Sequence, residues 1–412
     1  MKVETGFPGK GQEERVEEGD EAPPVDREGQ VPLPVPVGMG DDVDLRLRWH
    51  PPYCVRVADT LHQAAALEGF ARRIFLAMGA SGPVAATVAG HLVRANLSGH
   101  DSHGMLRIPQ YVADADRGDL VPSATAAVVS ESGAVGIVDA GRGFGHSAMA
   151  LAMEWTAERA IQFGIAAAAV RRANHIGRLG EYAELAAARG VIGIATVGVV
   201  GSGGVTPFGG RGRYLGTNPW AIGVPAAGEE PMIYDAATSA VAEGKLRVAL
   251  SKGARAPAGA IIDSAGKPSL DPADYYAGGA MLPLGGALAG HKGYGLALAS
   301  ALVGGLAMID GEDSTTAGTS STPGEPGWLA GAFVVAIDPE RFGGAERYRA
   351  AVAGALAGLR RQPPAEGVAE ILIPGDPERR SRALREREGI PIPDPVWSDL
   401  LEVAGRYGLA AG

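Results

Sequence analysis

Three residues within one short stretch have the side chains that acid–base chemistry on a small organic acid requires. His100 and His103 lie three positions apart between glycines, and Arg107 follows them. An imidazole titrates near neutral pH, so it can take or give the proton of a hydroxyl group. A guanidinium is planar and binds a carboxylate through two parallel hydrogen bonds. With loops that hold a nicotinamide dinucleotide against backbone amides, these groups would suit hydride transfer on a hydroxy acid.

The same stretch has several interpretations. His103 is predicted to be the proton-transfer group or a cofactor contact, and Arg107 to hold a carboxylate. A helical turn between them would put both side chains on one face. The alternative is a capping and packing motif at a helix junction, and His100 is expected to have such a structural role. A metal site through the two histidines lacks a clear third ligand. A serine hydrolase is not indicated, because the sequence around Ser202 lacks the G-x-S-x-G spacing.

Three further positions carry groups that suit the same chemistry. His175 is a second candidate for proton transfer, because nearby glycines would let a ligand approach the backbone; a hydrogen-bonded loop histidine is the alternative. Lys292 precedes Gly293 at a predicted helix start, where an anionic ligand is stabilised, although a surface lysine is also consistent. Asp235 follows a predicted strand and could accept hydrogen bonds from ribose hydroxyls or cap the next turn.

The predicted helices and strands place these residues at element ends. Ser81-Gly-Pro83 begins a helix that stops near Gly99, so the stretch with His103 follows a helix C-terminus. In the centre, a strand at 165–170, a loop, a helix at 179–189 and a strand at 191–197 form a βαβ unit. His175 then lies at the carboxyl end of a strand, where α/β sheets tend to bind ligands.

Other patterns complete the expected order of elements. The first helix is predicted from Leu61 to about Gly79, with Asp59 or Thr60 as its cap. Residues 198–219 look like an almost continuous loop, and a loop of that length is usually functional. Neither glycine cluster, Gly141–Gly145 or Gly201–Gly204, matches G-x-G-x-x-G, so no Rossmann fingerprint is found. Further strands are predicted at 127–130, 134–138, 220–225, 232–234, 333–338 and 371–373, a hairpin at 261–266, and helices at 146–163, 241–249, 291–308, 345–359, 379–387 and from 396.

The composition is that of a globular protein of two or three domains, with 412 residues, 46% hydrophobic and 20% charged. No apolar run resembles a membrane span, the N-terminus lacks a secretory pattern, and Cys54 is the single cysteine, so a cytoplasmic location is expected. Residues 1–45 hold 12 acidic and 4 basic side chains, which is −8 of the net charge of −10. The rest has no basic stripe, so nucleic acid is not expected as a partner. Residues 1–55 are predicted to be a disordered acidic, proline-rich extension.

Taken together, the motifs resemble those of the type 2 malate/L-lactate dehydrogenase family, over nearly all of the chain from about Val55 to Leu409. The family's order and approximate spacing are met by Gly99-His-Asp-Ser-His-Gly104 with Arg107, Asn174-His-Ile-Gly177, Pro207-Phe-Gly-Gly210, Leu215-Gly-Thr-Asn-Pro219, Asp235-Ala-Ala-Thr-Ser239, Lys292-Gly-Tyr-Gly-Leu296 and Pro374-Gly375-Asp376. Gly244-Lys-Leu-Arg-Val-Ala249 and its surroundings look most like the hydroxycarboxylate dehydrogenase B branch.

The resemblance implies an α/β, non-Rossmann fold with a mixed-sheet cofactor domain and a smaller helical domain. The helical domain would be residues 56–126, joined by helices at 379–412, and the NAD(P)-binding domain residues 127–378. It also implies a homodimer, no metal, and a small 2-oxo or 2-hydroxy acid as substrate. By similarity the candidate catalytic residues are His175 and His103, Arg107 binds substrate, and cofactor contacts fall on His103, Gly177, Arg178, Leu179, Ile233, Tyr234, Asp235, Ala236, Ala237, Lys292, Gly293, Gly375, Asp376 and Pro377.

Two departures from the family pattern leave the substrate open. Many members carry Asn or Gln followed by Ser or Thr where this chain has Gly198-Val-Val-Gly201, and Ala330-Gly331 replaces the usual asparagines before a late strand. The expected activity is that of an NAD(P)-dependent 2-hydroxy acid dehydrogenase. A cyclic imino-acid reductase and a catalytically silent nucleotide-binding protein are the alternatives. Asp376 mildly favours NAD, while Arg379, Arg380 and Arg382 could meet a 2′-phosphate or form a solvated helix face.

Overall fold

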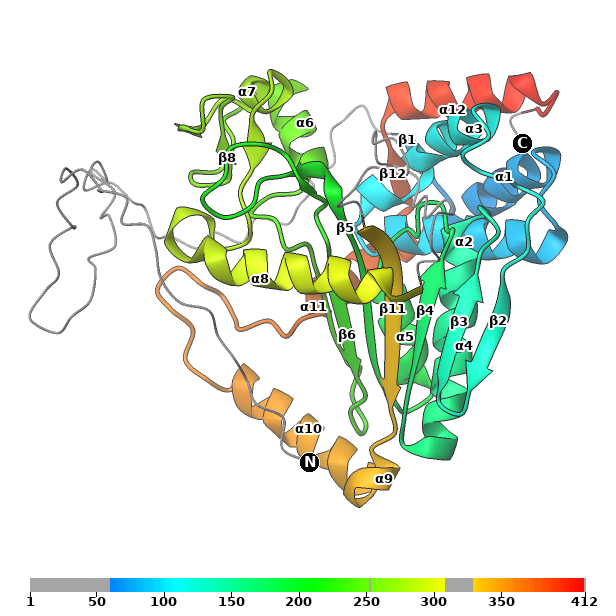
Figure 1. The fold of residues 1–412 in the computed structure, drawn as a ribbon, viewed down its shortest axis with the longest axis vertical. Helices are drawn as coiled ribbons and strands as arrows, with labels where there is room; N and C mark the ends of the chain where they lie inside the picture. The colour runs from blue at the N-terminus through cyan, green and yellow to red at the C-terminus, as the bar shows by residue number, and fades with distance from the viewer. Residues whose placement is uncertain (1–59, 252, 308–328, 411–412) are drawn as a thin grey trace, which may run out of the picture. The chain divides into compact units, whose positions relative to one another are not determined.

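The computed structural model describes residues 60–251, 253–307 and 329–410 (Figure 1). The predicted extension at 1–55 and Cys54 lie outside the described residues. No helix among those described is long and apolar enough to cross a membrane.

A layer of helices contains the first predicted helices and the end of the chain (Figure 1). Its buried side chains form one cluster, supplied mainly by α1 (Ala64–Ala77), α2 (Gly82–Leu97), α3 (Ile108–Asp116) and α12 (Asp394–Arg406). Helix α2 begins at the predicted place, and Ser81 caps it by accepting a hydrogen bond from Val84 N at 3.5 Å. The predicted cap at Thr60 is wrong, because β1 (Thr60–His62) pairs with β12 (Ile390–Ile392) and Gln63 precedes α1.

The main sheet is mixed, as expected. In spatial order its strands are β2 (Ala127–Ser132), β3 (Val135–Asp139), β4 (Ile165–Arg171), β11 (Leu329–Ile337), β5 (Ile192–Val205), β10 (Ala280–Met281), β8 (Ile261–Ile262) and β9 (Pro268–Ser269), while β6 (Trp220–Val224) pairs with β5 and with β7 (Met232–Ala236). β3 is parallel to β4 and β10 to β5, and the other pairs are antiparallel.

Glycines let helices approach both faces of this sheet. α4 (Gly145–Phe163) and α5 (Gly180–Ala188) cover one face, and α8 (Gly286–Gly304) covers the other. A Cβ built on Gly193 would overlap Ala186 of α5, and a Cβ built on Gly198 would overlap the backbone of α8 at Ala301. Since successive residues of a strand face opposite sides, the two glycines mark the two helix contacts.

The central βαβ prediction is confirmed in outline. β4 and β5 are both antiparallel to β11, which lies between them, so they are parallel to each other and joined through α5. The loop at 171–179 therefore follows the carboxyl end of β4 and precedes α5. The parallel partner β3 ends at the same edge of the sheet, at Asp139.

Several predicted boundaries are wrong. Residues 198–205 are not loop but the second half of β5, which was missed because glycines are depleted in strands; here close packing of α8 requires Gly198. α8 begins at Gly286 rather than at His291, with a non-helical residue at Ala289. Residues 371–373 do not pair as a strand, and β12 was not predicted. The remaining helices are α6 (Glu243–Ser251), α7 (Pro272–Tyr276), α9 (Glu340–Gly343), α10 (Ala345–Arg360) and α11 (Asp376–Glu388).

Candidate active site

The stretch after α2 is held in place by Asn96. Its Oδ1 accepts a hydrogen bond from Met105 N at 2.9 Å, and its Nδ2 donates to Asp101 Oδ1 at 2.6 Å. A Cβ at Gly104 would overlap the Asn96 side chain. This contact divides the stretch into two short 3-10 turns, 101–103 and 105–107, and the second of them starts between His103 and Arg107, as the sequence suggested.

Helix α11, near the C-terminus of the sequence, packs against the same stretch. Arg385 contacts both carboxylate oxygens of Asp101, at 2.6 and 3.0 Å, and His100 Nε2 lies 3.2 Å from Glu378 Oε1. Two hydrogen bonds to one carboxylate fix direction as well as distance. His100 therefore has a structural contact with α11, which His103 does not share.

The loop that carries His175 is fixed from two sides. Asn174 Oδ1 accepts a hydrogen bond from His175 N at 2.7 Å. Behind the loop, His91 Nε2 accepts one from Arg178 N at 2.8 Å, and His91 Nδ1 lies 3.2 Å from the Glu181 carboxylate. Gly177 has a φ of 73°, and a Cβ there would overlap His91. These contacts together fix the backbone conformation of the loop.

These two segments bring His103 and His175 together. Their rings are stacked, with centroids 5.6 Å apart and an angle of 17° between planes. Ser102 Oγ lies 3.0 Å from His103 Nδ1, and Tyr111 Oη lies 2.8 Å from His175 Nδ1. Each imidazole therefore has one nitrogen in contact with a hydroxyl group and a second nitrogen on the other edge of the ring.

Burial keeps both histidines neutral. Desolvation, together with the charge of Arg107, lowers the pKa of His103 to about 3. The same two causes lower the pKa of His175 well below its ordinary value. Neutral imidazoles can accept a proton from a hydroxyl group, and their protonated forms are strong acids here.

Arg107 is half-buried beside the two histidines. Its Nε donates to Ser102 O at 2.6 Å and its Nη1 to Gln110 Oε1 at 2.7 Å. Within the described ranges, no carboxylate pairs with Arg107. A positive charge held by neutral acceptors next to neutral histidines is suited to an anionic ligand.

The predicted cofactor residues Gly177, Arg178 and Leu179 form the turn before α5. The Arg178 side chain is 1% exposed and pairs with Glu184 at 2.7 Å, so only its backbone can face a ligand. Asp235, at the end of β7, accepts a hydrogen bond from Gly180 N at 2.7 Å through Oδ2. The turn and β7, which is predicted to bind the cofactor from Ile233 to Ala237, are therefore adjacent.

The other predicted cofactor segment, 375–377, joins β7 at its start. Ile233 N donates to Pro374 O at 3.0 Å, and Gly375 has a φ of 100° just before α11. Asp376 Oδ2 accepts a hydrogen bond from Ile373 N at 2.8 Å, while its Oδ1 is paired with Arg379 and Arg360. The carboxylate of Asp376 is therefore occupied by this turn.

Lys292 and Gly293 lie on α8, just after the non-helical residue. Lys292 is exposed, and no described hydrogen bond or ion pair links it to the two histidines. Gly293 is buried and packs so closely against the Leu284 backbone that a Cβ would overlap it. The predicted role of Lys292 in cofactor binding stays a prediction.

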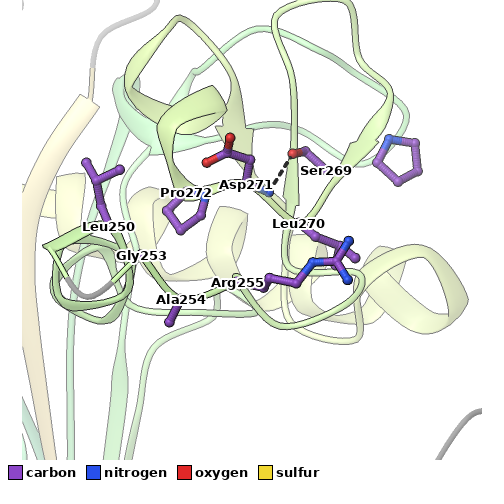
Figure 2. A pocket seen from close by; sticks show the side chains of 9 residues that line it. Leu250, Gly253, Ala254, Arg255, Ser269, Leu270, Asp271 and Pro272 are labelled. Carbon is purple, nitrogen blue, oxygen red and sulfur yellow. Dashed lines mark hydrogen bonds between the residues drawn. The ribbon is translucent and has the colours of Figure 1, made fainter.

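Figure 2 shows a pocket elsewhere, between the end of α6 and the residues around β9 and α7. Its charged side chains are Arg255 and Asp271, and Asp271 already caps α7 by accepting from Ala273 N at 2.9 Å. None of the predicted site residues lines this pocket. No group of three or more potential metal ligands occurs among the described residues.

Tyr111, His146 and His91 surround the site and were not selected from the sequence. Tyr111 and His146 are fully buried, and His91 is 1% exposed. His91 and His146 fall on the helices predicted at 81–99 and 146–163, where a single polar residue among apolar ones gives no signal of its own. The one available signal was the number of histidines, since His91 and His146 with His100, His103 and His175 make five of the eight in the sequence.

Comparison with known proteins gives consistent matches over this architecture. A model of the malate/L-lactate dehydrogenase family matches residues 62–401. Hydroxycarboxylate dehydrogenase B of Escherichia coli is 38% identical over 349 residues, which cover 84% of this chain and 94% of that protein. A Delta(1)-pyrroline-2-carboxylate/Delta(1)-piperideine-2-carboxylate reductase of Pseudomonas syringae pv. tomato is 34% identical, covering 81% and 93%. The structure of sulfolactate dehydrogenase from Methanocaldococcus jannaschii superposes with a TM-score of 0.76 at 33% identity, covering 85% and 98%.

Proposed function

Because this chain belongs to the malate/L-lactate dehydrogenase family, we propose that it is an NAD(P)-dependent oxidoreductase of small 2-oxo and 2-hydroxy carboxylic acids. The observation that carries the proposal is Arg107, a cation with neutral hydrogen-bond partners beside two stacked, neutral histidines. A 2-oxo acid has a carboxylate next to a carbonyl group. The first would bind Arg107, and the second would then lie near the imidazoles.

Each residue has a separate role in the proposed reaction. Arg107 orients the carboxylate through its guanidinium. His103 or His175 gives a proton to the substrate oxygen in reduction and takes it back in oxidation. A bound nicotinamide supplies the hydride or accepts it in the reverse direction. The half-buried setting of both histidines limits exchange of that proton with bulk water.

The chemistry around β7 and α11 fits a dinucleotide. Both described contacts of Asp235 use Oδ2, so Oδ1 can accept from a ribose hydroxyl. Gly177 and Gly375 have positive φ angles and no side chain, which allows close approach to the backbone. The proposed contacts at His103, Leu179, Tyr234, Ala236, Ala237, Lys292, Gly293 and Pro377 complete this set.

NAD is the proposed cofactor in preference to NADP. The three arginines that follow Gly375 each pair with a carboxylate: Arg379 with Asp376, Arg380 with Glu370 and Arg382 with Glu184. A 2′-phosphate would have to compete with these partners. Titration calorimetry with NADH and with NADPH tests the preference, and tighter binding of NADPH would reverse it.

Reduction of cyclic imino acids is the second candidate activity. The similarity to a Delta(1)-pyrroline-2-carboxylate/Delta(1)-piperideine-2-carboxylate reductase favours it. A cyclic imino acid also carries a carboxylate next to the carbon that receives the hydride, so Arg107 suits both substrates. A panel of 2-oxo acids and cyclic imines with NADH, followed at 340 nm, separates the two. Cofactor binding without turnover on any of them would instead favour a catalytically silent nucleotide-binding protein.

A homodimer and two domains are proposed as well. On α8, Leu288 is 92% exposed and Leu302 52%, and Leu306 in the 3-10 turn that follows is 65% exposed, which favours an interface with a second copy. Sedimentation velocity measures this directly, and a monomer at micromolar concentration would oppose it. The separate hydrophobic clusters of the helical layer and of the sheet support the proposed division into 56–126 with 379–412, and 127–378. Location in the cytoplasm stays a prediction.

A further inference from the structure

A chain of hydrogen bonds leads from His175 into the protein interior. Tyr111 Oη lies 2.8 Å from His175 Nδ1 and 3.3 Å from His146 Nε2. Tyr111 and His146 are both 0% exposed. The second nitrogen of His146, Nδ1, is buried and has no hydrogen-bond partner among the described residues. The chain therefore ends inside the protein.

Each side chain in this series of hydrogen bonds has one proton to donate. Burial raises the pKa of the Tyr111 hydroxyl well above its ordinary value, so Tyr111 stays protonated. Burial, followed by the electrostatic influence of the neighbouring His91, lowers the pKa of His146 well below its ordinary value, so His146 stays neutral. With one proton each, the two hydrogen bonds must run in the same direction along the chain.

The unpartnered nitrogen of His146 decides between the two directions. If His146 carried its proton on Nδ1, that N–H would be a buried donor without an acceptor, which is rare in proteins. With the proton on Nε2, His146 donates to Tyr111 Oη instead. Tyr111 then donates its own proton to His175 Nδ1, across the shorter of the two contacts.

We propose that Tyr111 and His146 are positioning residues that hold neutral His175 with its proton on Nε2. His175 would then offer a fixed N–H donor to the substrate oxygen. His103 is bound differently: its Nδ1 contacts the Ser102 hydroxyl, which can rotate to donate or to accept. The proton exchanged with substrate is therefore assigned to His103, and His175 stabilises the charge that develops on the oxygen. This catalytic part rests on the proposed function, whereas the position of the proton does not.

Nitrogen NMR of the full-length protein labelled with 15N-histidine tests the position of the proton without any substrate. Neutral His175 should show a protonated Nε2 and an unprotonated Nδ1, with its signals assigned through the His175→Gln variant. Tyr111→Phe should convert His175 to a mixture of the two tautomers. Tyr182→Phe is the matched control, because Tyr182 is also fully buried but donates to Ile176 O, a backbone group in the same loop. A protonated Nδ1 in the unmodified protein would overturn the proposal.

Variants of His146 test the direction of the chain. In His146→Gln the amide can still donate to Tyr111, and the tautomer of His175 should be kept. In His146→Leu that donor is lost, and the tautomers should mix. With an active substrate, Tyr111→Phe should lower kcat roughly tenfold with little change in KM. A His146→Leu protein with the unmodified spectrum and kcat would overturn the proposal. Absence of turnover on every acid or imine would reject the proposed function alone.

Discussion

The imidazole rings of His103 and His175 are stacked with centroids 5.6 Å apart, although they come from different segments of the chain. His103 contributes to the lowered pKa of His175, after the larger effects of burial and Arg107. One proton on either ring would therefore oppose a second proton on its neighbour. The pair is expected to exchange one proton with substrate, not two.

Replacing either histidine should remove this exchange, with unequal consequences. His103→Gln is expected to lower kcat by about 10²–10⁴ and to abolish the pH dependence of the chemical step. His175→Gln should lower kcat less and keep the pH dependence, because glutamine can still donate to the substrate oxygen. The double variant should be little worse than His103→Gln, as residues that act together are not additive. Steady-state rates of reduction from pH 5 to 9 give the comparison, because the protonated fraction of His103 falls with rising pH throughout this range. Equal profiles for both single variants would contradict the division of roles.

Arg107→Lys should keep the positive charge and lose the bidentate hydrogen bonding to a carboxylate. The expected loss in kcat/KM for a 2-oxo acid is roughly 10²-fold, with most of it in KM. Arg117→Lys is a matched control, since Arg117 lies nearby in sequence but is exposed and paired with Asp114 and Asp119. Wild-type kinetics in Arg107→Lys would show that the substrate carboxylate binds elsewhere.

Much of the site could be predicted because its motifs are local. The spacing of His103 and Arg107, the loop with His175, and the βαβ order around it are all encoded within short windows of sequence. The contacts that fix them are not local. Asn96 reaches across the motif to Met105 N, and Arg385 reaches Asp101 from the C-terminal helix. Such partners depend on the packed fold, and single residues in helices carry no periodic signal for them.

The errors in the predicted fold have the same origin. The glycines of β5 looked like a loop, but they serve the close approach of α8 to the sheet. A helix cap was expected at Thr60, but this residue pairs with Ile392 in a strand. In both cases a neighbour distant in sequence determines what the residue does. Local propensity describes the segment alone and is overridden by that neighbour.

Gly177→Ala should disturb the His175 loop by two effects at once. The φ of 73° disfavours alanine, and the new Cβ would overlap His91, which holds Arg178 N. Gly118→Ala separates the two effects, because Gly118 has a φ of 78° with no atom within 4 Å of the added carbon. The control should lose about 1–2 kcal/mol of unfolding free energy from backbone strain. Gly177→Ala should lose more, together with most of its turnover. If both variants lose the same free energy of unfolding in urea, His91 can move aside for the new Cβ at no measurable cost.

The buried histidines should make the folded chain sensitive to mild acid. Burial is the largest cause lowering the pKa of His62, His103, His146 and His175 in the folded state. Below their ordinary value of 6.5, the unfolded chain binds protons that the folded chain does not. Stability is therefore unaffected above that pH and falls as the pH drops below it, down to about 3 for His103.

The slope should approach roughly 1 kcal/mol of unfolding free energy per pH unit for each histidine that stays neutral in the folded chain. Urea unfolding at pH 7, 6 and 5 measures it in a range where most carboxylates remain ionised. His146→Gln should reduce the slope by the share of one histidine, because glutamine does not titrate. Asp399→Asn, at an exposed carboxylate in α12, should leave the slope unchanged. A free energy of unfolding that is constant from pH 7 to 5 would mean that the histidines accept protons without unfolding.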